Sequence, residues 1–95
     1  MYGTIFNLSV KPGHEDKLLS VLNSQNIPDG GVAWFVLKPD ENKSDWIGVA
    51  VVENKEKYLE NTSRPEQHEQ FLSMMEHLIC EPTWTDGEYI VGEVV

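Results

Sequence analysis

His68 and Asn7 are the two residues whose types and positions best suit chemistry. His68 precedes Phe71 by three residues and Leu72 by four, so a helix would turn its imidazole toward an apolar stripe. An imidazole with a pKa of about 6.5 can accept a phenolic proton at neutral pH. Asn7 interrupts an apolar strand with an amide that could hold a carbonyl or a developing oxyanion. We therefore take both as candidate catalytic residues.

Both residues also have a simpler interpretation. His68 could be hydrogen bonded to backbone at the edge of the core, and Asn7 could face water, since both faces of its strand contain polar residues. Nearby apolar and aromatic side chains could line a pocket. The candidate substrate-binding residues are Phe6, Trp34, Tyr58, Phe71, Leu72, Met75 and Trp84. Side chains of these types equally suit a core or a dimer interface.

The sequence contains no recognisable metal or cofactor motif. His68 and His77 are nine residues apart, which at about 100° per residue places them on opposite faces of a helix. Cys80 is the only cysteine, so it can form neither an intrachain disulfide nor, by itself, a zinc site. No phosphate-binding glycine loop and no nucleophile motif occur. We therefore expect no metal and no cofactor.

Hydrophobic period and turn signals predict the elements that must position these residues. Strands are expected at 2–10, 32–37, 46–52 and 89–95, and helices at 14–25, at 54–61 and from 63 toward Pro82. Ser63 and Glu66 have the spacing of a capping box for the third helix, and Asp86-Gly87 resembles a turn before the last strand. This order, β-α-β-β-α-β with one extra helix, predicts a single α+β, ferredoxin-like domain over residues 1–95 with a four-stranded antiparallel sheet.

The predicted sheet has apolar residues on both faces. Residues 32–37 and 46–52 are apolar at consecutive positions, whereas a sheet with one wet face would alternate apolar with polar residues. Helices can shield only one face of this sheet. In a chain of 95 residues the second face of the sheet is most simply covered by the sheet of a second copy. We therefore expect a homodimer; the alternative is a monomer with an exposed apolar face.

Charge and composition argue against several classes of partner. Seven Lys and Arg against sixteen Asp and Glu give a net charge of −9, the wrong sign for nucleic acid or anionic lipid. No stretch approaches the roughly 20 apolar residues of a membrane span, and the first residues lack the pattern of a signal peptide. We expect no nucleic-acid partner, no membrane partner and a cytoplasmic location, which the single cysteine also favours.

The layout of the elements and three segments of the chain are similar to those of a known family. The segments are 10–16 (VKPGHED), 66–71 (EQHEQF) and 82–89 (PTWTDGEY). They resemble the antibiotic biosynthesis monooxygenase (ABM) family of the dimeric α+β barrel superfamily. The resemblance implies a pocket in each protomer, between the sheet and the helices, lined largely by apolar and aromatic side chains. That superfamily includes cofactor-independent oxygenases of aromatic polyketides and quinols, haem-degrading enzymes and members with no known activity.

Two functions of different classes follow from these observations. The first is a cofactor-independent monooxygenase acting on a small aromatic or quinol-type compound, with His68 as base or substrate hydrogen-bond partner, Asn7 as carbonyl anchor and the aromatic residues as walls. The second is a non-catalytic dimeric module that binds a small aromatic or apolar metabolite. Haem breakdown is less favoured: Asn7 matches the asparagine of haem-degrading members, but no tryptophan lies between Trp46 and Trp84, where those members have one. A purely structural dimer without a pocket is a further possibility.

Overall fold

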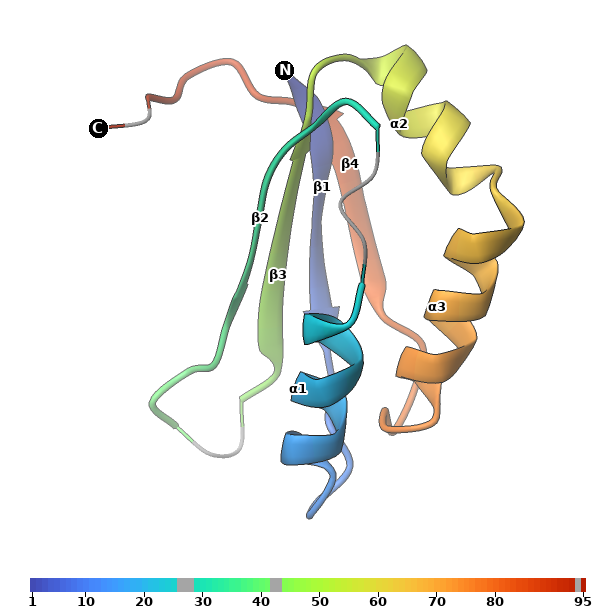
Figure 1. Ribbon diagram of the computed structural model, residues 1–95. Helices are drawn as coiled ribbons and strands as arrows, with labels where there is room; N and C mark the ends of the chain where they lie inside the picture. Colours follow the sequence, from blue (N-terminus) through green and yellow to red (C-terminus); the bar gives the residue numbers. More distant parts are fainter. Residues whose placement is uncertain (26–28, 42–43, 94) are drawn as a thin grey trace.

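The chain forms one four-stranded sheet with three helices packed on one side of it (Figure 1). The computed structural model describes residues 1–95 except 26–28, 42–43 and 94. In chain order the elements are β1 (Tyr2–Leu8), α1 (Glu15–Asn23), β2 (Gly31–Leu37), β3 (Trp46–Val52), α2 (Lys55–Thr62), α3 (Pro65–Met75) and β4 (Thr83–Glu88). The strands lie in the order β2-β3-β1-β4, and neighbouring strands are antiparallel. The predicted α+β, ferredoxin-like architecture is confirmed.

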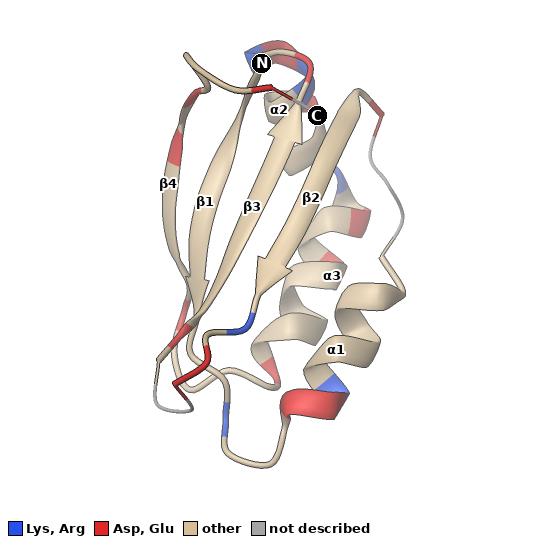
Figure 2. Ribbon diagram, turned by 90° about the vertical axis from the view of Figure 1, so that its left-hand side faces the viewer, with Lys and Arg blue, Asp and Glu red and all other residues tan. Residues whose placement is uncertain are grey.

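The two faces of the sheet differ in what covers them. Alternation along β1 directs Phe6 and Leu8 toward the helices and places Ile5 and Asn7 on the opposite face. Figure 2 shows that no helix lies over this second face. Within the described chain the helices therefore cover one face of the sheet, and the other face is open.

The hydrophobic core fills one end of the space between the sheet and the helices. Its buried members, from β1, β3, α1, α3 and the turn after α3, are Leu8, Leu18, Leu22, Trp46, Met74 and Leu78. Burying a side chain of this size stabilises the fold by about 1.5–3 kcal/mol, so these contacts hold α1 and α3 against the sheet. Toward the other end of the sheet the residues facing the helices are small, with Thr4 on β1 opposite Ala50 on β3. Space is left there between the two layers.

The last strand lies earlier in the chain than the sequence predicts. The strand expected at 89–95 is wrong: β4 ends at Glu88 and runs through Asp86-Gly87, which resembled a turn. β4 is an edge strand that pairs only with β1, and all of its side chains are exposed, so it needs no apolar run. After β4 the Tyr89 hydroxyl donates a hydrogen bond to the carbonyl oxygen of Ala50 at 2.8 Å. This hydrogen bond attaches Tyr89, the first residue of the segment that was expected to form the last strand, to Ala50 of β3.

The start of α3 also differs from the prediction, because the capping box of Ser63 and Glu66 does not form. The N-cap residue is Arg64, and no side chain caps the helix. The Ser63 hydroxyl instead donates to the carbonyl oxygen of Leu59, in the preceding helix, at 2.8 Å. Pro65 suits the first helical position because its missing N–H would have no partner there. None of the helices in the described residues has the length and apolar character needed to cross a membrane.

Candidate functional site

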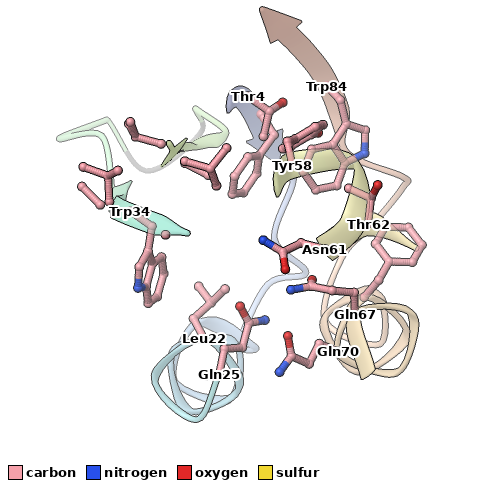
Figure 3. Close-up of a pocket in the computed structure, with 18 of the residues that line it drawn as sticks. Thr4, Leu22, Gln25, Trp34, Tyr58, Asn61, Thr62, Gln67, Gln70 and Trp84 are labelled. Carbon is pink, nitrogen blue, oxygen red and sulfur yellow. The ribbon is translucent and has the colours of Figure 1, made fainter. Parts of the chain in front are cut away.

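A cavity of about 300 Å³ lies between the sheet and the helices, beside the core (Figure 3). Its volume is at the lower end of the range found for small-molecule sites, roughly 300–1,000 Å³. The strands and helices around it contribute mainly apolar and aromatic side chains. The described residues that line it are Thr4, Phe6, Leu22, Gln25, Trp34, Ala50, Tyr58, Asn61, Thr62, Gln67, Gln70, Phe71, Met74 and Trp84, with residues 31–33 and 51–52. The cavity lies where the family resemblance places a pocket.

Aromatic rings form two sides of the cavity. The Phe6 and Trp84 rings lie 4.8 Å apart between centroids, and Phe71 lies 6.4 Å from Trp84. Figure 3 shows Trp34 on the opposite side of the cavity from Trp84. The Phe6 ring packs directly over Gly48, where an added Cβ would collide with it. Rings arranged in this way can stack on a planar ligand, at about 0.5–1.5 kcal/mol per pair beyond the area buried.

Asn61 brings a buried hydrogen-bond acceptor without a partner to this cavity. The residue belongs to α2, is 5% exposed, and directs its amide into the space between sheet and helices (Figure 3). Its Nδ2 donates to the carbonyl oxygen of Asp29 at 3.0 Å, which determines the end of the amide that carries the nitrogen. Among the described residues, Asn61 Oδ1 has no hydrogen-bond donor. A buried acceptor left unpaired costs about 1–3 kcal/mol.

The position of Asn61 is set by contacts between α2 and the segment before β2. Asn54 caps α2, because its Oδ1 accepts a hydrogen bond from the backbone N–H of Lys57 at 2.9 Å. Lys57 Nζ in turn lies 2.8 Å from Asp29 Oδ2, a contact that lowers the pKa of Asp29 and raises the pKa of Lys57. Gly30 has a φ of 78°, a backbone conformation that glycine adopts without strain. These contacts hold the Asp29 carbonyl in place for Asn61.

Tyr58 is the only titratable residue among the described residues that line the cavity. Its hydroxyl donates to Asp86 Oδ1 on β4 at 2.8 Å. Partial burial, and then the hydrogen bond and negative charge of Asp86, raise the pKa of Tyr58 to about 12. At neutral pH this phenol is protonated, and its proton is directed away from any ligand. The described cavity wall therefore contains no ionised group.

The structure brings five of the seven predicted substrate-binding residues to the cavity, namely Phe6, Trp34, Tyr58, Phe71 and Trp84. The other two lie elsewhere. Leu72 is 52% exposed, and Met75 packs against the core. Whether the five lining residues bind a substrate stays a prediction at this point.

His68 and Asn7, the predicted catalytic residues, do not line the cavity. Asn7 is exposed on the open face of the sheet, beside Ile5, because strand alternation turns it away from the helices. His68 is exposed on α3. The side of α3 that faces the sheet is formed by Gln67, Gln70, Phe71 and Met74, which are spaced three, four and seven residues apart. The expectation that His68 faces inward is thus corrected, since that expectation took Leu72 rather than the glutamines as inward-facing.

The lining residues that sequence analysis missed include apolar ones such as Leu22 and Met74, but the polar ones matter most for recognition. Asn61, Gln67 and Gln70 line the cavity although amide side chains are usually found at the surface. A signal for the glutamines was present, because they share the helical spacing of Phe71 and Met74. Asn61 had no such signal, since its orientation depends on a contact with a residue 32 positions earlier in the chain.

A pair of histidines lies outside the cavity, between the start of α1 and the turn after α3. The Nδ1 atoms of His14 and His77 are 3.1 Å apart, and Lys11 N donates to the carbonyl oxygen of His77 at 2.9 Å. Partial burial, and then the positive charges of Lys17, His77 and Lys11, lower the pKa of His14. In the part of the chain that the structure describes, no group of three or more His, Cys, Asp or Glu is placed to hold a metal ion. The contact between the two imidazole rings joins the start of α1 to the turn after α3.

Comparisons with known proteins identify the fold. The sequence matches no family model and no curated protein. Solved structures match closely in shape. A proposed antibiotic biosynthesis monooxygenase from Nitrosomonas europaea superposes with a TM-score of 0.80 over 96% of this chain and 100% of that chain, at 12% sequence identity. One from Bordetella bronchiseptica has a TM-score of 0.80, covers 95% and 97% of the two chains, and is 13% identical. One from Chloroflexus aurantiacus has a TM-score of 0.70, covers 96% of each chain, and is 19% identical.

These likenesses show that the chain has an ABM-type fold, as its sequence resemblance predicted. At such low identity the likeness concerns the fold alone, because one fold can serve many functions.

Proposed function

We propose that this protein binds a small aromatic or quinol-type compound in the cavity and oxygenates it with molecular oxygen, without a cofactor. The observation that supports binding most directly is the arrangement of Phe6, Trp84 and Trp34 around a largely apolar space of about 300 Å³. Trp34 and Trp84 are 39% and 45% exposed, so burial under a ligand would remove apolar ring surface from water.

The oxygenation half of the proposal draws on the names of the structural neighbours, which are proposed antibiotic biosynthesis monooxygenases. Without a cofactor, the substrate itself must supply four electrons. In the keto tautomer of a phenol, the ring carbon para to the oxygen bears two hydrogens; it would gain one oxygen atom as a carbonyl, and the second oxygen atom would leave as water with both hydrogens. The protein's contribution would be to hold the ring in a dry, fixed orientation beside oxygen.

The cavity wall offers little general-base catalysis for such a reaction. Among the described residues that line the cavity, the Tyr58 hydroxyl is the only group that titrates, and it donates its proton to Asp86. A carboxylate is a weak base toward a phenol, so this contact would accept a phenolic proton poorly. Turnover of this kind would therefore suit a substrate that is already easily oxidised.

The lack of a strong base among the described lining residues favours a second candidate function, a non-catalytic module that binds and sequesters the same compound. Oxygen uptake separates the two functions. Under the first, an easily oxidised dihydroxynaphthalene is consumed faster with the protein than without it, in a ratio that falls when Trp84→Ala is substituted. Under the second, the protein binds the compound and slows its oxidation. Failure to bind any naphthalene-sized aromatic compound at millimolar concentration would contradict both.

We also propose that two copies associate through the open face of the sheet. Phe35, Leu37 and Ile5 are 66%, 58% and 44% exposed on this face, and Figure 2 shows the four strands uncovered there. Apolar side chains gathered on one face in this way are unusual in a monomer, and a self-complementary pairing would bury them.

A further inference from the structure

Among the described residues that line the cavity, the polar side chains held by hydrogen bonds to the protein present acceptors to a ligand. Asn61 Oδ1 is an acceptor, and its amide cannot reverse without losing the hydrogen bond from Nδ2 to the Asp29 carbonyl and placing two acceptors against each other. The buried end of the cavity therefore presents an oxygen atom with free lone pairs.

The hydroxyl groups that line the cavity have the same polarity. Thr4 donates its proton to the carbonyl oxygen of Thr85 at 3.2 Å, and Thr62 donates to the carbonyl oxygen of Leu59 at 3.0 Å. Tyr58 donates to a carboxylate, as described above. A hydroxyl has one proton and two lone pairs, so each of these three groups retains only acceptor capacity for a ligand.

The remaining polar side chains do not reverse this preference. The partly exposed lining residues Gln25, Gln67 and Gln70 can rotate either end of the amide toward a ligand. The amide nitrogen can donate to a carbonyl group and the amide oxygen can accept from a hydroxyl group, so these residues do not distinguish the two. Figure 3 shows Gln67 and Gln70 near Asn61. A ligand reaches Asn61 Oδ1, which is shielded from water, by displacing these long and flexible side chains.

We propose that the cavity selects aromatic compounds in their hydroxylated, protonated form, with a phenolic O–H donated to Asn61 Oδ1. This inference rests on the proposed binding function and adds to it the chemical class and redox state of the ligand. A quinone carbonyl or an aryl ether has no proton to donate, so it leaves Asn61 Oδ1 unpaired and faces the lone pairs of three hydroxyls. The site therefore holds the quinol or phenol and releases the quinone-like product of its oxidation.

A matched pair of ligands tests this selection. 1-Naphthol and 1-methoxynaphthalene share one ring system, and only the naphthol has a proton to donate. Isothermal titration calorimetry on the wild-type protein is expected to show about tenfold tighter binding of 1-naphthol, the ratio for one buried hydrogen bond. The more apolar methoxy compound would bind more tightly if apolar burial alone decided affinity. In Asn61→Leu the ratio is expected to fall toward one, while in Ser63→Ala, which removes a hydrogen bond at the end of the same helix outside the cavity, it is expected to persist.

The outcomes separate this inference from the function on which it rests. If neither compound binds, the aromatic pocket is refuted and the selection falls with it. If both bind to the wild type with equal affinity, the pocket stands and the selection is refuted. If Asn61→Leu binds both compounds and keeps the tenfold ratio, Asn61 is not the acceptor and the proposal is overturned. The wild-type comparison decides the selection even if Asn61→Leu does not fold.

Discussion

Replacing Asn61 with leucine is expected to stabilise the empty protein, although polar-to-apolar changes at contact-making residues usually destabilise. The substitution removes the hydrogen bond from Nδ2 to Asp29, worth about 0.5–1.5 kcal/mol. It also removes an unpaired buried acceptor, which costs about 1–3 kcal/mol. The Asp29 carbonyl belongs to an exposed residue and can turn to water when its donor is lost. A net gain of about 1 kcal/mol corresponds to a rise in Tm of roughly 4–8 °C for a domain of this size.

The assay is thermal unfolding by circular dichroism at one protein concentration, because association makes Tm depend on concentration. Asn54→Ala is the matched control. It removes the side-chain cap of the same helix, so it is expected to lower stability by about 1 kcal/mol. If Asn61→Leu lowers Tm as much as Asn54→Ala does, then Asn61 Oδ1 is paired in the empty protein, and the reasoning about its availability to a ligand is refuted.

Three further predictions concern the open face and two titrating groups. Phe35→Lys on the open face is expected to convert a dimer to a monomer in light scattering, whereas Leu72→Lys on α3 leaves it a dimer; a monomeric wild type would refute the interface. The lowered pKa of His14 means that the unfolded chain binds its proton more readily, so unfolding free energy from urea titrations should rise with pH up to about 6.5. His14→Asn should flatten that rise, and an unchanged slope would contradict it. Because burial, and then the Asp86 contact, raise the pKa of Tyr58 to about 12, stability should fall between about pH 10 and 12, and less so in Tyr58→Phe; equal falls would show that the pKa of Tyr58 is not raised by folding.

The elements that were predicted well are those in which burial in the sheet requires a run of apolar residues. Residues 46–52 were expected to form a strand and do so with the same bounds, because a short continuous apolar run flanked by polar residues is typical of a buried strand. β4 was missed because an exposed edge strand does not need apolar residues, and Asp86-Gly87 within it has the composition of a turn.

The site was harder to predict than the fold, because its polar members depend on contacts far apart in sequence. Aromatic residues such as Trp34 and Trp84 were expected in the pocket from their size and apolar character. The inward side of α3 was misjudged because Gln67 and Gln70 are polar but face a cavity, whereas Leu72 is apolar but exposed. No periodicity distinguishes a glutamine beside a cavity from one beside water.

The exposed ring surface in the cavity and the unpaired Asn61 oxygen both cost free energy, and one ligand would remove both costs. Apolar ring surface in contact with water is unfavourable, and a buried acceptor without a donor lacks a hydrogen bond. A compound that fills the space between Phe6, Trp34 and Trp84 and donates a proton to Asn61 covers the rings and supplies the missing hydrogen bond. By mass action, such a ligand at one hundred times its Kd raises the free energy of unfolding by about 2.7 kcal/mol. A ligand that binds tenfold more weakly would still add about 1.4 kcal/mol at that concentration. A rise in Tm with 1-naphthol that is about twice the rise with 1-methoxynaphthalene would therefore identify the hydrogen bond, in addition to the filled volume, as a term that decides binding.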